Sequence, residues 1–214
     1  MTMSDLVLYG NKPLTSPYVM SVFVALAEKG LAFDFVQLSL DNGEHLTAGH
    51  IQLSLTNRVP TLVHEGFALS ESSAITEYLE ERFPPPQYAR LYPADLHERA
   101  RVRMVQALIR SDFLPIREER STDTVFANVP PKPLSPVAAA AAERLHRIAG
   151  TLIQRSETFL ASDFSIADVD LAMMLQRLLS NGDPVPPTLA DYASRIWSRP
   201  SVLRWLALTG YRAR

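Results

Sequence analysis

The stretch from Asn57 to Phe83 constrains the fold of this chain most, because two short apolar runs, a turn and a helical pattern follow one another within it. Thr61 to His64 is rich in β-forming residues, Glu65-Gly66 is typical of a tight turn, and a second run covers 67–69. A serine-rich cap over 70–73 precedes a helical pattern whose apolar residues are Ile75, Tyr78, Leu79 and Phe83. The stretch therefore predicts strand, turn, strand and helix.

Two features of this stretch indicate more than packing. Pro60 stands just before a strand, where its missing N–H removes a ladder donor, so we expect a special turn with a cis peptide bond. Glu71 and Ser72 place a carboxylate, a hydroxyl and free backbone N–H groups together at a helix N-terminus. Such a combination suits the ammonium and carboxylate ends of an amino acid. Each feature alone is typical of an ordinary loop or cap, but their order is specific.

The composition excludes several classes of function. The chain has 214 residues, enough for one large or two modest domains, and no cysteine, which excludes disulfides, thiolate metal sites and a cysteine nucleophile. The net charge is −2, so electrostatic attraction does not favour binding to nucleic acid or to an anionic membrane. The first apolar run, Leu6 to Tyr9, is too short for a signal peptide or a membrane span, so we expect a cytoplasmic protein.

The N-terminal part also predicts a βαβ unit. Leu6 to Tyr9, ending at Gly10, indicates a first strand, and 33–40 indicates a second strand parallel to it. Between them, Ser16-Pro17 is typical of a helix N-cap followed by proline at the first helical position. The polar segment 41–56 is expected to be irregular.

Three prolines at 84–86 break the chain, and everything beyond the linker that ends at Pro93 has helical patterns. We expect one long helix from Asp95 to about Arg120, a loop over 121–134 and a helix from 135 to about 160. Ser165 and Asp168 form a capping-box pattern before a helix that is apolar nearly all round and hence central to its domain. Two short helices follow, and no metal-spaced cluster of His and Asp appears.

The stretch 57–83 is similar to the glutathione-binding half of the glutathione S-transferases, which carry V-P before one strand and E-S at the next helix. The resemblance covers essentially the whole chain and fits the bacterial YfcF-like subgroup best. It implies an α/β plus all-α fold: a thioredoxin-like, glutathione-binding domain over 1–84 and an all-helical domain over 93–214. In this family Pro60 would be cis, the Val59 backbone would pair with the peptide part of glutathione, and Glu71 and Ser72 would hold the γ-glutamyl end.

The S-P-Y-V sequence at 16–19 stands where glutaredoxin-like folds carry C-P-Y-C. The resemblance therefore implies a serine-type site, in which the Ser16 hydroxyl donates a hydrogen bond to the sulfur of glutathione. A bare N-cap is the alternative for Ser16, and Thr15, one residue away, offers the same chemistry. Gly43 to Leu46 (G-E-H-L) resembles the G-Q-H-L of theta-type members. The resemblance implies that His45 binds the glycyl carboxylate of glutathione. A solvated loop histidine is the alternative there.

Arg58 stands where theta-type members carry a lysine for that same carboxylate, and a guanidinium can bind it bidentately. The resemblance thus implies a transferase that holds glutathione as the thiolate for attack on small apolar electrophiles or organic hydroperoxides, in detoxification or oxidative stress. Glutathione-dependent disulfide reduction is a variant of this chemistry, and a non-catalytic glutathione-binding or regulatory protein is the alternative. Retention of Ser16, Pro60, Glu71 and Ser72 favours catalysis. The family also implies a homodimer that uses no metal.

Overall fold

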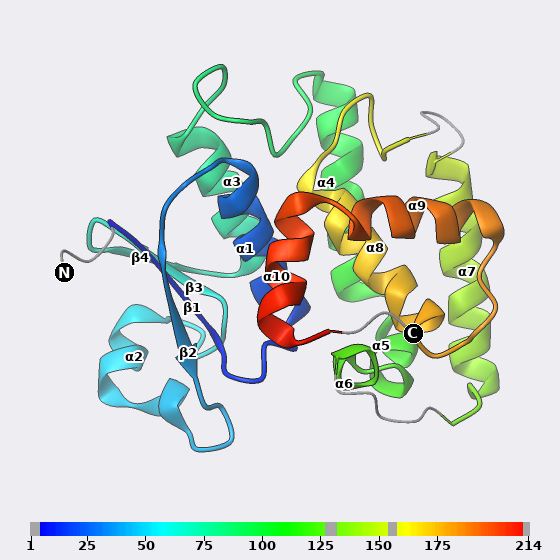
Figure 1. Ribbon diagram of the computed structural model, residues 1–214, viewed down its shortest axis with the longest axis horizontal. Coiled ribbons are helices and arrows are strands. Elements are labelled where there is room, and N and C mark those ends of the chain that lie inside the picture. Colours follow the sequence, from blue (N-terminus) through cyan, green and yellow to red (C-terminus); the bar gives the residue numbers. More distant parts are fainter. Residues whose placement is uncertain (1–4, 127–131, 154–157, 212–214) are drawn as a thin grey trace. The chain divides into compact units, whose positions relative to one another are not determined.

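The computed structural model describes residues 5–126, 132–153 and 158–211 (Figure 1). The chain divides into two compact units, residues 1–91 and 92–214, and each is described by itself. The first is a four-stranded sheet with helices and the second is helical. This is the predicted combination of a thioredoxin-like domain and a helical domain. No helix in the described ranges combines the length and the apolar character that crossing a membrane requires.

The sheet of the N-terminal unit has the strand order β2-β1-β3-β4. Its strands are β1 Leu6–Asn11, β2 Asp34–Leu38, β3 Thr61–His64 and β4 Phe67–Ser70. β1 and β2 are parallel, as the sequence predicts, whereas β3 runs antiparallel to both β1 and β4. β1 continues one residue past the predicted end at Gly10, because Asn11 still pairs with Leu38 of β2.

The helices of this unit are α1 Pro17–Glu28, the 3₁₀ helix η1 Glu44–Leu46, α2 Ala48–Leu53 and α3 Ser72–Arg82. α1 begins where Ser16 and Pro17 predict, and α1 packs against α3. The expectation that 41–56 is irregular is wrong, because η1 and α2 lie within it. α2 is only six residues long, includes Gly49 and buries only His50, so it has too few apolar positions to leave a periodic signal.

A buried ion pair joins the C-terminal parts of α1 and α3. The Lys29 ammonium contacts the Glu80 carboxylate at 2.9 Å, with side-chain exposures of 0% and 4%. Lys29 also donates to the carbonyl oxygens of Phe83 (2.8 Å) and Ala89 (2.9 Å), and Glu80 accepts from the Leu91 backbone N–H at 2.9 Å. The pair therefore fixes the two helices to each other and to the segment that ends the unit.

The helices of the C-terminal unit are α4 Leu96–Ser111, α5 Leu114–Glu119, α6 Thr122–Phe126, α7 Pro136–Ile153, α8 Ile166–Leu179, α9 Pro187–Trp197 and α10 Pro200–Thr209. Asp95 caps α4 as predicted, accepting from the backbone N–H groups of His97 and Glu98. The prediction of one helix to about Arg120 is wrong, because the chain breaks at 112–113 and restarts as α5. Pro115 in the first turn of α5 has no N–H for a continuous helix and disfavours helical geometry in the residue before it.

The structure differs in part from two further predictions for this unit, the loop over 121–134 and the helix from 135 to about 160. The expected loop over 121–134 contains α6, and 127–131 lie outside the described residues. The helix expected from 135 to about 160 ends at Ile153 as α7, and 154–157 also lie outside the described residues.

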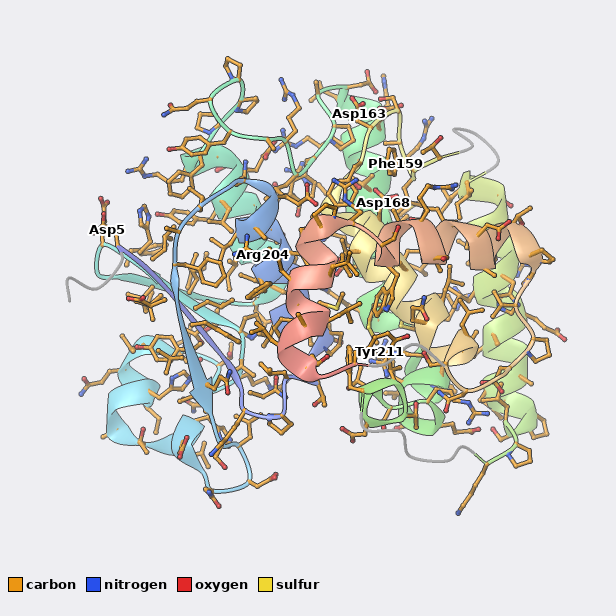
Figure 2. The ribbon with its side chains drawn as sticks, viewed as in Figure 1. Asp5, Phe159, Asp163, Asp168, Arg204 and Tyr211 are labelled. Atoms are coloured by element: carbon orange, nitrogen blue, oxygen red, sulfur yellow. The ribbon has the colours of Figure 1, made fainter. Side chains whose placement is uncertain are left out.

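α8 is the centre of the C-terminal unit, since every residue from Ile166 to Leu178 is buried. The predicted capping box is present at its start, where Figure 2 labels Asp168. The Asp168 carboxylate accepts from the backbone N–H groups of Leu160 and Ser165 and from the hydroxyls of Ser165 and Tyr192. Burial raises the pKa of Asp168, and these hydrogen bonds oppose the rise. Its role is structural, as predicted.

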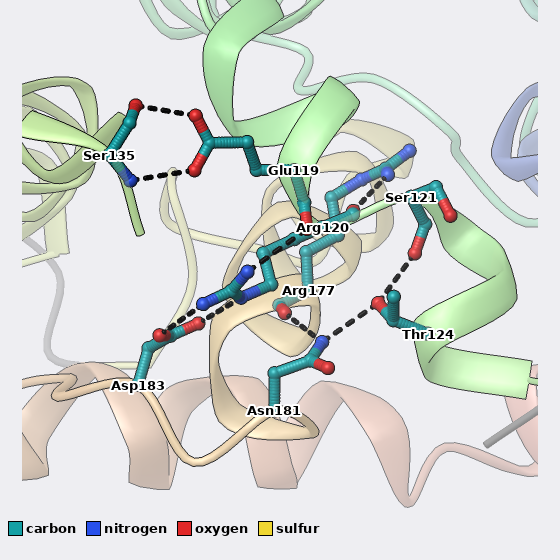
Figure 3. A network of polar contacts seen from close by, with 8 residues as sticks. All are labelled: Glu119, Arg120, Ser121, Thr124, Ser135, Arg177, Asn181 and Asp183. Carbon is teal, nitrogen blue, oxygen red and sulfur yellow. Dashed lines mark hydrogen bonds and ion pairs between the residues drawn. The ribbon is translucent and has the colours of Figure 1, made fainter. Parts of the chain in front are cut away.

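A second polar network joins α5 and α6 to the turn after α8 (Figure 3). The buried Arg120 guanidinium makes two contacts with the Asp183 carboxylate, at 2.6 and 2.8 Å, and this contact raises the pKa of Arg120. Arg177 donates to the Arg120 carbonyl at 2.7 Å, and the Asn181 amide donates to the Thr124 hydroxyl at 2.8 Å. These contacts satisfy the backbone where α5 ends.

Candidate functional site

One edge of the sheet gathers most of the predicted site residues. β1 runs toward this edge and leads into Ser16, β3 starts from it after Pro60, and β4 returns to it before Glu71 and Ser72. The register agrees, because Thr61 pairs with both Tyr9 and Ser70. Three connections that are far apart in the sequence therefore meet at one place.

Ser16 is half-buried and is the N-cap of α1. Its Oγ accepts a hydrogen bond from the Val19 backbone N–H at 3.3 Å. A hydroxyl accepts and donates at the same time, and within the described residues the Ser16 O–H has no acceptor. Capping and donation to a sulfur are therefore compatible roles for this one side chain.

Asn11, at the end of β1, organises both candidate hydroxyls. Its side chain is buried, its Nδ2 donates to Thr15 Oγ1 at 3.1 Å, and its Oδ1 accepts from the Ser16 backbone N–H at 3.2 Å. Because a backbone N–H can only donate, the Asn11 atom that faces Ser16 is the oxygen, which fixes the amide orientation. The sequence reasoning considered Asn11 only as a fallback partner of the thiolate, together with backbone N–H groups, should neither Ser16 nor Thr15 serve. Its signal was a polar residue directly after a buried apolar strand.

The Val59–Pro60 peptide bond is cis, as predicted. The carbonyl oxygen of Arg58, just before it, accepts from the hydroxyls of Ser54 (3.1 Å) and Thr61 (3.0 Å). In the part of the chain that the structure describes, the N–H and carbonyl of Val59 make no hydrogen bond. These two backbone groups are free for an extended peptide ligand, whereas the Arg58 side chain is exposed to solvent.

Glu71, rather than one of the predicted serines, is the N-cap of α3, because β4 continues to Ser70. Glu71 has φ +71°, which few residues other than glycine adopt, and such geometry is concentrated at functional sites. The Glu71 side chain is exposed and makes no hydrogen bond or ion pair to another described residue. Ser72 is buried in the first turn of α3. The carboxylate is thus free to meet a cation at a helix N-terminus.

His45 is half-buried in η1, and its Nδ1 is buried with no hydrogen-bond partner among the described residues. The buried His50 of α2 lies beside it and packs on the Tyr9 ring, with centroids 5.4 Å apart. Burial lowers the pKa of His50, the charge of His45 lowers it further, and the Arg58 carbonyl opposes both effects. The sequence reasoning did not single out His50.

Two family models match the chain, one to each half. The model described as the glutathione S-transferase N-terminal domain matches residues 13–87, and the model described as the C-terminal domain matches residues 95–211. The first match includes every predicted site residue. The second covers more than half of the chain.

The similar proteins include a glutathione transferase homologue with bound glutathione and two proteins named for other functions, an isomerase and a starvation protein. A crystal structure of a glutathione transferase homologue from Burkholderia strain BGR1, with bound glutathione, is 42% identical, covers 96% of this chain and 97% of its own, and has a TM-score of 0.78. The stringent starvation protein A homologue of Haemophilus influenzae is 28% identical over 94% of this chain and 90% of its own length. The maleylacetoacetate isomerase of Pseudomonas aeruginosa is 43% identical over 51% of this chain, which spans half of the isomerase.

Proposed function

Because the chain belongs to the glutathione S-transferase family, we propose that it binds glutathione at the sheet edge and activates it as the thiolate. The observation that carries the proposal is the Ser16 hydroxyl, which keeps its proton available at the N-terminus of α1. The 42% identical homologue with bound glutathione supports the ligand.

Each part of glutathione has a partner at this edge. The exposed Glu71 carboxylate binds the γ-glutamyl ammonium, while Ser72 and the first turn of α3 bind its carboxylate. The free N–H and carbonyl of Val59, next to Pro60, pair with the peptide part. At the other end, His45 and Arg58 bind the glycyl carboxylate. All of these roles are proposals from the geometry.

The thiolate is stabilised by Ser16. A free thiol has a pKa near 8.5, so only a few per cent is ionised at neutral pH. A hydrogen bond to a charged acceptor contributes roughly 1.5–3 kcal/mol, and one pKa unit corresponds to about 1.4 kcal/mol. One hydroxyl therefore lowers the thiol pKa by roughly one to two units, and the N-terminus of α1 adds to the effect. Asn11 holds the backbone of Ser16 in place.

The thiolate then attacks a small apolar electrophile. A sulfur–carbon bond forms and the leaving group departs with its electron pair. With an organic hydroperoxide, the sulfur attacks the terminal oxygen, the O–O bond breaks and an alcohol leaves; a second glutathione then gives the disulfide and water. Disulfide reduction uses the same thiolate. We assign the protein to detoxification or oxidative stress in the cytoplasm, as a homodimer without a metal cofactor.

Two other functions have a specific observation in their favour. The match to maleylacetoacetate isomerase favours a glutathione-dependent isomerase, and the match to stringent starvation protein A homologues favours a binding or regulatory protein. Retention on a glutathione column with no turnover of electrophiles, hydroperoxides or maleylacetoacetate would identify the regulatory alternative. Turnover of maleylacetoacetate alone would identify the isomerase.

The decisive experiment compares Ser16→Ala with Thr15→Ala in the pH dependence of kcat/KM for glutathione. We expect Ser16→Ala to raise the pKa of bound glutathione and lower the rate at neutral pH by roughly ten- to hundredfold, with partial recovery at higher pH. If Ser16 is only a cap, alanine costs about 1 kcal/mol of stability and leaves the profile in place. A shift in Thr15→Ala alone would transfer the role to Thr15. A shift in neither variant would contradict the serine-type mechanism.

A further inference from the structure

A cavity of about 870 Å³ lies within the C-terminal unit, between the end of α8 and the helices α9 and α10. Gln176 comes from α8, Trp197 ends α9 and Ala207 belongs to α10. Tyr211, which Figure 2 labels, follows α10. The volume is in the range of small-molecule pockets. The residues proposed above for glutathione all belong to the other unit, so the proposed function does not account for this cavity.

Gln176 gives the cavity a polar anchor. The residue is 8% exposed, it lines the cavity, and its side-chain amide makes no hydrogen bond to any other described residue. Because neither amide atom is sealed from solvent, the amide opens into the cavity and is available to a ligand. The Trp197 Nε1–H also has no acceptor within the described ranges, but it is sealed from solvent and does not open into the cavity. The Gln176 amide is therefore the group of the wall that can bond a polar ligand.

The rest of the wall defines the chemistry of that partner. The Trp197 and Tyr211 rings lie 6.4 Å apart at 74°, and the leucine side chains of Leu179, Leu203 and Leu206 add apolar surface. Among the described residues that line the cavity, none has a charged side chain. An ion in such surroundings would be left unpaired, which costs far more than burial of a neutral group. The wall thus favours an uncharged ligand with an aromatic body.

We propose that this cavity is a second ligand site, which binds an uncharged aromatic molecule carrying a carbonyl or amide group. The aromatic body contacts the leucines and the two rings, and the polar group bonds the Gln176 amide. None of the residues that line it belongs to the proposed glutathione site, so glutathione should not compete for it.

The first test uses 6-propionyl-2-(dimethylamino)naphthalene, a neutral fluorescent ketone, titrated into the full-length protein. Its analogue without the carbonyl, 2-(dimethylamino)naphthalene, is the matched ligand. We expect saturable binding of the ketone and a loss of about three- to tenfold in Gln176→Leu, the effect of a single net hydrogen bond. The analogue should bind the variant as well as it binds the wild type. Gln176→Leu should fold normally, because its amide has no partner within the described residues.

The second test fills the cavity. Ala207→Phe places a ring at an exposed lining position of α10, and Leu208→Phe, at the next residue and outside the lining, is its control. We expect the first variant to weaken both probes at least tenfold and the control to weaken neither. Benzamide should compete with the ketone more than tenfold better than benzoate, and glutathione should not compete.

Four results would overturn the proposal. They are the absence of saturable binding, an equal effect of Gln176→Leu on both probes, competition by benzoate as strong as by benzamide, and displacement by glutathione. The last result would place the probe in the glutathione site and would leave the proposed transferase function intact. Failure of the Ser16 experiment, conversely, would leave the cavity proposal intact.

Discussion

Lys29→Met should destabilise the N-terminal unit strongly, because it removes one partner of a buried ion pair. The Lys29 ammonium has three acceptors, namely the Glu80 carboxylate and the carbonyls of Phe83 and Ala89, all within 2.9 Å. Methionine keeps the apolar stem but removes every one of these contacts. The Glu80 carboxylate would remain buried, with the Leu91 N–H as its one remaining donor among the described residues.

The magnitude follows from this geometry. Removing one partner of a buried ion pair typically costs about 3–5 kcal/mol, because the other charge is left uncompensated. For a chain of this length, each kcal/mol lowers Tm by about 2–4 °C, so Lys29→Met should lower Tm by about 6–20 °C. The double variant Lys29→Met/Glu80→Leu removes both charges and should recover part of the loss, since an apolar pair often replaces a buried ion pair at little cost.

Urea and thermal unfolding of the wild type, Lys29→Met, Glu80→Leu, the double variant and Lys12→Met measure these effects. Lys12 is exposed, so its variant controls for the loss of a lysine charge. A cost below about 1 kcal/mol for Lys29→Met, or a double variant as unstable as the sum of the two single changes, would refute the reasoning. The ion pair joins α1 to α3, and the N-termini of these two helices carry Ser16 and Ser72. We therefore also expect Lys29→Met to raise KM for glutathione.

Three further predictions concern the site and the assembly. Glu71→Gln should raise KM for glutathione by about tenfold or more with little effect on kcat, because the carboxylate contacts the ligand in ground and transition states alike; an unchanged KM would mean that the γ-glutamyl site lies elsewhere. Burial lowers the pKa of His50 from 6.5, so the unfolded chain binds the proton more tightly; stability should be fully present above pH 6.5 and fall below it, and unfolding of His50→Leu at pH 5 and 8 should show a smaller loss than the wild type. The protein should sediment as a dimer at micromolar concentration, and a monomer mass would contradict the family expectation.

Local signals along the chain determined much of the fold. Ser16-Pro17 places the start of α1, and Ser165 with Asp168 places the start of α8, because capping depends on residues only three positions apart. Strand and turn chemistry over 61–70 likewise predicts β3 and β4, because alternation and turn preference are also short-range. The ends and breaks of elements were less predictable: α5 separates from α4, and α2 forms in a segment with little periodicity.

Only the tertiary structure decided which groups meet and which remain free. The antiparallel β3 and β4 bring Val59 and Glu71 to the edge where β1 ends. There the Val59 backbone groups and the Glu71 carboxylate have no hydrogen-bond partner among the described residues. The packing of α8, α9 and α10 likewise leaves the Gln176 amide without a hydrogen-bond partner among the described residues. Burial and the absence of a partner are properties of contacts between distant segments, so no local pattern in the sequence encodes them.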